Sequence, residues 1–213
     1  MAIETSKAPS QGQMSAMTYL DELMPSSGPP VGGAFRSFGI AGAPGPTSTT
    51  LSDPLPIFTV PIGKITQTDF LKSAAQTGWR YFVSGGGEDA VADVAPNGES
   101  FARLTKGEFA TRLGEATAMA EAKYGAAPEV YEPRVLELPG LQLFALWLHG
   151  EQADHFVTAL DGANPQTPPA FDDGFLGRAI ARARAKQPAP LPAASAPVPQ
   201  PPARRRPRGG AAS

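Results

Sequence analysis

The most apolar stretch of the chain, residues 141–148, has hydrophobic side chains on both faces of the strand that its composition predicts. Successive side chains of a strand point to opposite faces. One face carries Leu141, Leu143, Ala145 and Trp147, and the other carries Gln142, Phe144, Leu146 and Leu148. The neighbouring predicted strands have a charged residue on one face, as a half-solvated sheet requires. We therefore expect 141–148 to be a central strand.

Alternation and turn signals divide the middle of the chain into short strands and two helices. The predicted strands are 57–65, 79–83, 90–94, 100–104, 133–139, 141–148 and 155–160. The pair Asn97-Gly98 favours a hairpin between two of them. Hairpin turns between most strands indicate an antiparallel sheet. The predicted fold class is α+β, with a mainly antiparallel sheet, two helices on one face, and disordered N- and C-terminal tails.

The two helices are predicted at 66–78 and 105–125. The second has the stronger signature, because Thr105 and Glu108 match the S/T-x-x-E capping box. It continues as an apolar stripe at helical spacing, formed by Phe109, Leu113, Ala116 and Ala120. For the first helix, Thr66 or Thr68 could provide the cap.

Pro- and Gly-rich segments flank this region and predict four parts. Residues 1–54 are expected to be a disordered arm with a possible short helix at 14–24, either idle or folding on a partner. Residues 55–160 form the α+β domain, and 161–186 a loop followed by a basic amphipathic helix. Residues 187–213, rich in Pro, Ala and Arg, are expected to be a disordered tail.

Charge is distributed unevenly along the chain. No acidic residue follows Asp173, whereas 174–213 hold eight of the 18 Lys and Arg residues. The first 173 residues therefore carry ten basic and 20 acidic residues, a net charge of −10. This split indicates an anionic partner, or a basic end that folds back on an acidic body. A partner such as nucleic acid or an anionic surface would contact Arg204, Arg205, Arg206 and Arg208.

The second face of 141–148 is the candidate interaction site. It would place apolar side chains next to Phe82, Phe101 and Val135, ringed by Arg80, Arg103 and Glu137. An apolar patch with a charged rim is typical of a contact surface. The predicted partner-binding residues are Phe144, Leu146, Leu148, Phe101 and Arg103. The alternative is that a segment of the same chain, such as 31–60 or 170–185, covers this face.

Catalytic and metal-binding patterns are weak throughout. The chain has no cysteine, which excludes disulfides, thiolate metal sites and a Cys nucleophile. His149 and His155 flank a predicted turn but match no established metal motif. The glycine-rich 84–89 lacks the lysine of a phosphate-binding loop. We expect no catalytic residue, metal or cofactor, and we interpret Trp79 and Trp147 as core anchors.

The sequence therefore favours a non-enzymatic binding or adaptor protein that uses an apolar sheet face and disordered arms. We expect it to be soluble and cytoplasmic, without a membrane span, and to bind a protein partner or a second copy. One alternative is a small-molecule binder or enzyme with a pocket lined by Trp79, Phe144 and Trp147. Another is an accessory factor that binds nucleic acid or an anionic membrane through its basic tail.

Overall fold

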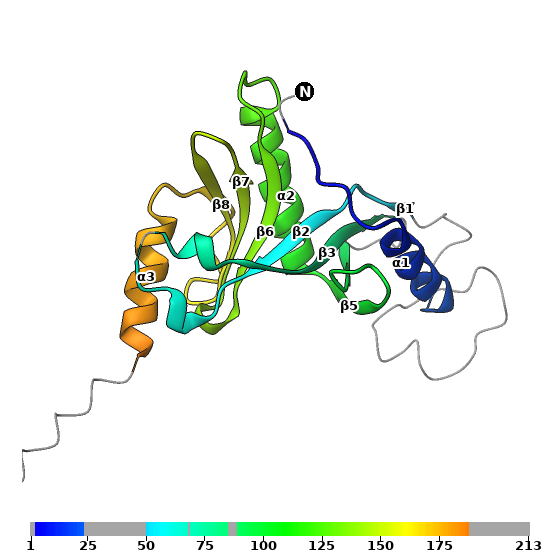
Figure 1. The fold of residues 1–213 in the computed structure, drawn as a ribbon, viewed down its shortest axis with the longest axis horizontal. Coiled ribbons are helices and arrows are strands. Elements are labelled where there is room, and N and C mark those ends of the chain that lie inside the picture. The colour runs from blue at the N-terminus through cyan, green and yellow to red at the C-terminus, as the bar shows by residue number, and fades with distance from the viewer. Residues whose placement is uncertain (1–2, 24–49, 68, 85–88, 188–213) are drawn as a thin grey trace, which may run out of the picture.

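The computed structural model describes residues 3–23, 50–67, 69–84 and 89–187, and their strands form one twisted sheet (Figure 1). The strand order is β5-β4-β3-β2-β6-β7-β8-β9, and β1 also pairs with β3. The strands are β1 Thr50–Leu51, β2 Leu55–Thr59, β3 Ala75–Ser84, β4 Ala90–Val94, β5 Phe101–Lys106, β6 Glu132–Leu138, β7 Leu143–His149, β8 Asp154–Asp161 and β9 Ala170–Phe171. The helices are α1 Ser10–Leu23, α2 Glu108–Tyr124 and α3 Phe175–Lys186. The predicted disorder of 24–49 and 188–213 lies outside the described residues.

The α+β class and the mainly antiparallel sheet are confirmed, since among the named strands of the described residues only β2 and β6 pair in parallel. As predicted, β7 is an interior strand, lying between β6 and β8. The prediction of a helix at 66–78 is wrong. That segment holds one short 3₁₀ turn, Phe70–Ser73, because β3 begins at Ala75 and its first residues pair with the end of β2.

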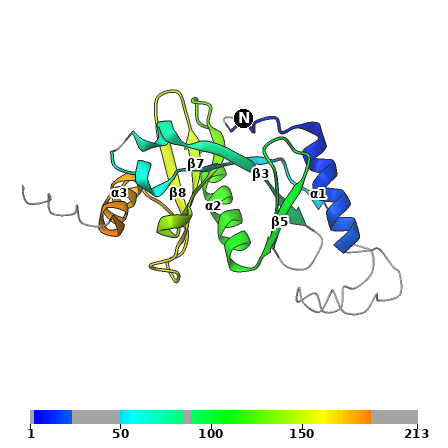
Figure 2. The same cartoon turned by 60° about the horizontal axis from the view of Figure 1, so that its bottom comes forward.

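The described residues contain three α-helices rather than two, and they lie on both faces of the sheet (Figure 2). Alternate residues of β7 show the division. Leu146 and Leu148 share a core cluster with α2, whereas Leu143 and Trp147 share another with α3. The sheet and its helices thus form three layers at the centre, and both apolar faces of β7 pack against helices of the same chain.

The helix predicted at 105–125 forms as α2, but its capping box does not. Thr105 stays in β5, where it pairs with Val91, and the helix begins after Gly107 with no side-chain cap. Gly107 has a φ of +81°, a left-handed value that favours glycine at this strand-to-helix turn. The prediction of an apolar stripe along this helix is confirmed at Leu113, Ala116 and Ala120, which are buried.

The short helix predicted at 14–24 corresponds to α1, which packs on the β3–β5 end of the sheet. Ala16 and Leu20 are buried in a cluster with Trp79 and neighbouring residues of β3 and β4. Tyr19 of α1 stacks on Phe101 of β5, with ring centroids 3.8 Å apart. In this structure α1 therefore folds against its own chain.

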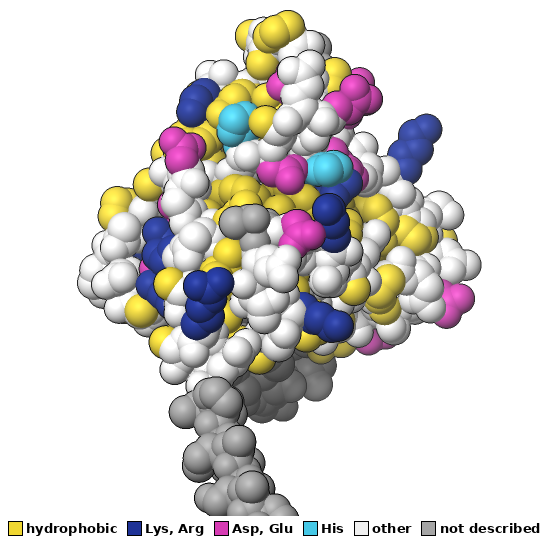
Figure 3. All heavy atoms as spheres, turned by 60° about the vertical axis from the view of Figure 1, so that its left-hand side comes forward, with side chains coloured by type: hydrophobic (Ala, Val, Ile, Leu, Met, Phe, Trp, Pro, Cys, Tyr) yellow, Lys and Arg dark blue, Asp and Glu magenta, His cyan; other side chains and the backbone are white. Residues whose placement is uncertain are grey.

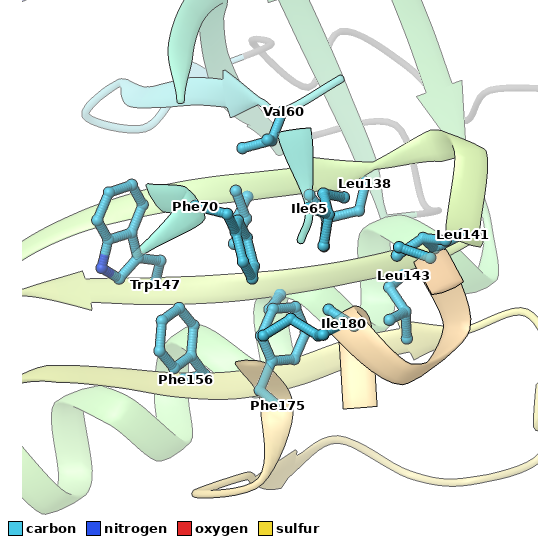
Figure 4. Packing of buried hydrophobic residues seen from close by; sticks show 14 residues of the cluster. Val60, Ile65, Phe70, Leu138, Leu141, Leu143, Trp147, Phe156, Phe175 and Ile180 are labelled. Atoms are coloured by element: carbon cyan, nitrogen blue, oxygen red, sulfur yellow. The ribbon is translucent and has the colours of Figure 1, made fainter. Parts of the chain in front are cut away.

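The basic helix predicted at 175–186 forms as α3 and docks on the acidic body. Phe175 and Ile180 turn toward the sheet, where Phe175 stacks on Phe156 (Figure 4). Ion pairs between α3 and the body also stabilise this interface. Arg182 makes two hydrogen bonds of 2.7 and 2.8 Å to Asp161, and Arg178 pairs with Asp172. This arrangement confirms docking of the basic helix on carboxylates of the body.

Candidate functional site

The apolar face proposed from the sequence as a contact surface lies in the core. Leu146 and Leu148 have no exposed surface and pack beneath α2. Phe144 is half-buried and meets Phe109 of α2 edge-on, with ring centroids 5.3 Å apart. Among the described residues, the segment that covers this face is α2, whereas α3 packs on the opposite face and 31–49 lie outside the described residues. An open patch at Leu146 and Leu148 is accordingly excluded within the monomer.

A register shift separates the two β5 residues of the predicted site. Asp93 and Val94 are consecutive in β4 but pair with Arg103 and Phe101, so Ala102 is an extra residue in β5. Phe101 therefore packs on the α1 side of the sheet, away from Phe144. Arg103 lies near the α2 side, where its guanidinium reaches Asp93 at 2.6 Å and Glu137 at 2.8 Å.

Arg103 belongs to a four-residue ion network whose centre is Arg80. Arg80 has no exposed side-chain surface and lies 2.7 Å from both Asp93 and Glu137. Burial opposes its charge, but the hydrogen bond to Asp93 and the two carboxylate charges outweigh it and raise the pKa of Arg80. The sequence correctly grouped Arg80, Arg103 and Glu137 on one face. Each charge is paired within the network. We therefore interpret the network as structural, fixing the register of β3, β4, β5 and β6.

A hollow of about 790 Å³ lies beside the turn that connects β7 and β8. Three segments enclose it: 4–6, 128–132 and the β7–β8 turn at 149–152. Its lining residues are Glu4, Thr5, Ser6, Pro128, Glu129, Val130, Glu132, His149, Gly150, Glu151 and Gln152. Four of these carry carboxylates and none is Lys or Arg. We call this feature the acidic hollow.

Backbone contacts hold the three walls of the acidic hollow together. Ile3 forms a parallel bridge with Tyr131, and the Glu4 N–H donates to the Tyr131 carbonyl at 3.0 Å. The dark-blue N-terminal segment therefore passes close to the connection between α2 and β6 (Figure 1). A Cβ at Gly150 would lie 2.7 Å from Glu129 Oε1 and 2.8 Å from Tyr131 Cε1. Glycine is thus needed for the β7–β8 turn to approach this wall.

Hydrogen bonds fix the protonation states at the base of the acidic hollow. The Tyr131 hydroxyl donates to Glu129 at 2.7 Å, which lowers the pKa of Glu129. The same hydrogen bond, with burial and the charge of Glu129, raises the pKa of Tyr131 to about 12. At neutral pH Glu129 is therefore an anion and Tyr131 a hydrogen-bond donor.

The other carboxylates of the acidic hollow differ in their availability. Glu132 is paired with Arg134. Glu4 and Glu151 are exposed, and neither forms an ion pair with any described residue. These two side chains are thus available to a cation that enters from solvent.

The two histidines do not converge on a shared site. His149 pairs across the turn with Asp154, and its Nδ1 lies 2.8 Å from a carboxylate oxygen of that residue. His155 pairs with Leu148, so it points to the opposite face, where it stacks on Tyr124. Two separate histidine patches are visible in Figure 3. Among the described residues, no group of three or more His, Asp or Glu side chains is placed to hold a metal.

The pocket proposed from Trp79, Phe144 and Trp147 is not formed. Trp79 belongs to the cluster beneath α1, Phe144 lies against α2, and Trp147 lies in the cluster beneath α3. Both tryptophans are buried, which confirms their interpretation as core anchors. Of the glycine-rich 84–89, residues 85–88 lie outside the described residues, as do Arg204, Arg205, Arg206 and Arg208.

The sequence does not predict the acidic hollow, because its walls come from three distant segments. The segment 149–155 contains both histidines, Glu151 and Asp154, but nothing in the sequence places 4–6 and 128–132 beside it. Within the described part of the chain, no helix has the length and apolarity needed to cross a membrane. Comparison of the chain with protein families, curated proteins and solved structures finds no match.

Proposed function

We propose that this protein is a non-enzymatic binding protein that holds a basic, extended polypeptide segment in the acidic hollow. The observation that carries the proposal is the lining itself, which combines four carboxylates with no Lys or Arg. Guanidinium groups form strong hydrogen bonds with carboxylates, and Arg is the side chain best suited to such pairs. The sequence also favoured a binding protein, but we now place the binding site in this hollow rather than on the sheet face.

Two further features favour a polypeptide over a free cation. Val130 is 49% exposed and lines the hollow, so an apolar side chain of the ligand has a surface to contact. The wall at 4–6 belongs to no helix or strand, and its backbone pairing with Tyr131 ends at Glu4. An extended ligand could add hydrogen bonds to such backbone, as in strand addition.

The expected binding is weak and depends strongly on salt. Exposed ion pairs contribute only about 0.2–1 kcal/mol each, and screening weakens them further as ionic strength rises. A protein partner or a second copy could supply the basic segment. The cytoplasmic location expected from the sequence stays a prediction.

Fluorescence anisotropy with a labelled octa-arginine peptide tests the proposal on the full chain. We expect saturable binding at low salt that is lost in the double variant Glu4→Lys, Glu151→Lys, because both side chains are exposed and free to pair with the peptide. The double variant Glu22→Lys, Asp53→Lys is the matched control, since both residues are also exposed but lie outside the acidic hollow. Equal loss of binding in the control, or unchanged binding in the Glu4→Lys, Glu151→Lys variant, would contradict the proposal.

A further inference from the structure

We propose that residues 204–208 of the same chain, Arg-Arg-Arg-Pro-Arg, occupy the acidic hollow and compete with any external basic segment. This inference rests on the proposed function and names the regulation of that site. Charge complementarity is the first argument. The segment carries four arginines and no acidic residue, and it meets a lining of four carboxylates with no basic residue.

The chain is long enough for the segment to reach the acidic hollow. α3 ends at Lys186, whose ammonium donates to the Gly140 carbonyl at 2.8 Å. Gly140 lies just before β7, and His149 at the far end of β7 lines the hollow. Nine residues at a strand rise of about 3.3 Å separate the two points by at most about 30 Å. Residues 188–204 number 17, and a chain of that length would span about 53 Å if extended like a proline-rich linker.

The part of the basic end that the structure describes already binds the body in this way. Arg182 of α3 makes a two-pronged contact with Asp161, and Arg178 pairs with Asp172. These pairs hold the start of the tail against the same sheet that carries the hollow. A tethered segment then acts at an effective concentration on the order of millimolar, so it can fill a site whose affinity for a free peptide is weak.

The test compares octa-arginine binding to the wild-type full chain and to a full-length variant with Arg204, Arg205, Arg206 and Arg208 changed to Gln. If the tail fills the hollow, removing its charges frees the site and tightens peptide binding. With a millimolar effective concentration and a dissociation constant of about 0.1 mM for the peptide, the expected gain is about tenfold. Circular dichroism melting checks that the four substitutions leave the fold unchanged.

A control removes the general effect of lowering the positive charge. The same four substitutions are made in a protein that also carries Glu4→Lys and Glu151→Lys. Because the binding site is altered in this background, self-occupancy predicts that removal of the tail arginines gives no gain in peptide affinity. Equal affinity of wild type and tail variant, with binding still dependent on Glu4 and Glu151, would overturn self-occupancy and leave the proposed function intact. Binding that ignores Glu4 and Glu151 in both proteins would overturn the proposed function, and self-occupancy with it.

Discussion

At the scale of single residues, the clearest lesson is how far a charge can be buried when its partners are fixed. Arg80 lies in the sheet with no exposed side-chain surface, whereas Arg103, which contacts the same two carboxylates, is 51% exposed. We predict that Arg80→Ala lowers the free energy of unfolding by about 3–5 kcal/mol, because Asp93 and Glu137 lose a buried partner. Arg103→Ala should cost about 1 kcal/mol or less. Urea denaturation measures both, and similar losses would refute this view of the network.

Asp161 gives a second prediction, on pH. Its hydrogen bond from Arg182 is the main cause that lowers the pKa of Asp161 below the ordinary value of 3.8. A lowered pKa in the folded state stabilises the fold above the unfolded value and loses that effect as pH falls through the folded one. Arg182→Gln should therefore destabilise the protein above about pH 4, and the difference from wild type should shrink at lower pH. Arg184→Gln is the control, because Arg184 contacts a carbonyl rather than a carboxylate. A difference in stability between Arg182→Gln and wild type that stays constant down to pH 2 would rule out this linkage.

The residue scale also shows what the sequence could and could not predict about the site. Strict alternation placed Arg80, Arg103 and Glu137 on one face, and the structure joins them in one network that also includes Asp93. The same alternation misplaced Phe101, because one extra residue in a strand moves the following side chains to the other face. Such a shift is decided by pairing between strands, and no local pattern signals it.

At the scale of elements, residues whose tertiary partners agree with their local pattern were predicted well. The 175–186 helix matches α3 at both ends, since its apolar and basic faces both find partners on the body. The predicted helix at 66–78 failed, because pairing of Ala75 and Gln76 with β2 outweighs a weak helical preference.

α1 supplies the prediction at this scale. Leu20 is buried against the β3–β5 end of the sheet, whereas Met14 on the same helix is 62% exposed. Leu20→Ala should lower the free energy of unfolding by about 2–5 kcal/mol, as expected for removal of a buried leucine side chain. Met14→Ala should change it by less than about 0.5 kcal/mol. Thermal or urea unfolding of the two variants decides the matter, and equal effects would show that α1 does not pack on the sheet in solution.

At the scale of the whole molecule, both apolar faces of the central strand are covered by helices of the same chain, and the hollow that we propose as the binding site is polar. The sequence anticipated an acidic body with a basic end. It could not anticipate the acidic hollow, which exists only because the N-terminal segment, the α2–β6 connection and the β7–β8 turn meet in space.

The most direct test of the binding claim is to map where a basic peptide contacts the protein. Amide chemical shifts would be recorded by NMR for the full-length variant with its four tail arginines changed to Gln, as octa-arginine is added. Binding in the acidic hollow predicts that the largest shifts fall at 129–132 and 149–152 and at Glu4, and that they vanish with Glu4→Lys and Glu151→Lys. Shifts centred elsewhere, for example at the smaller hollow beside Arg112 and Gln166, or no shifts at all, would contradict it.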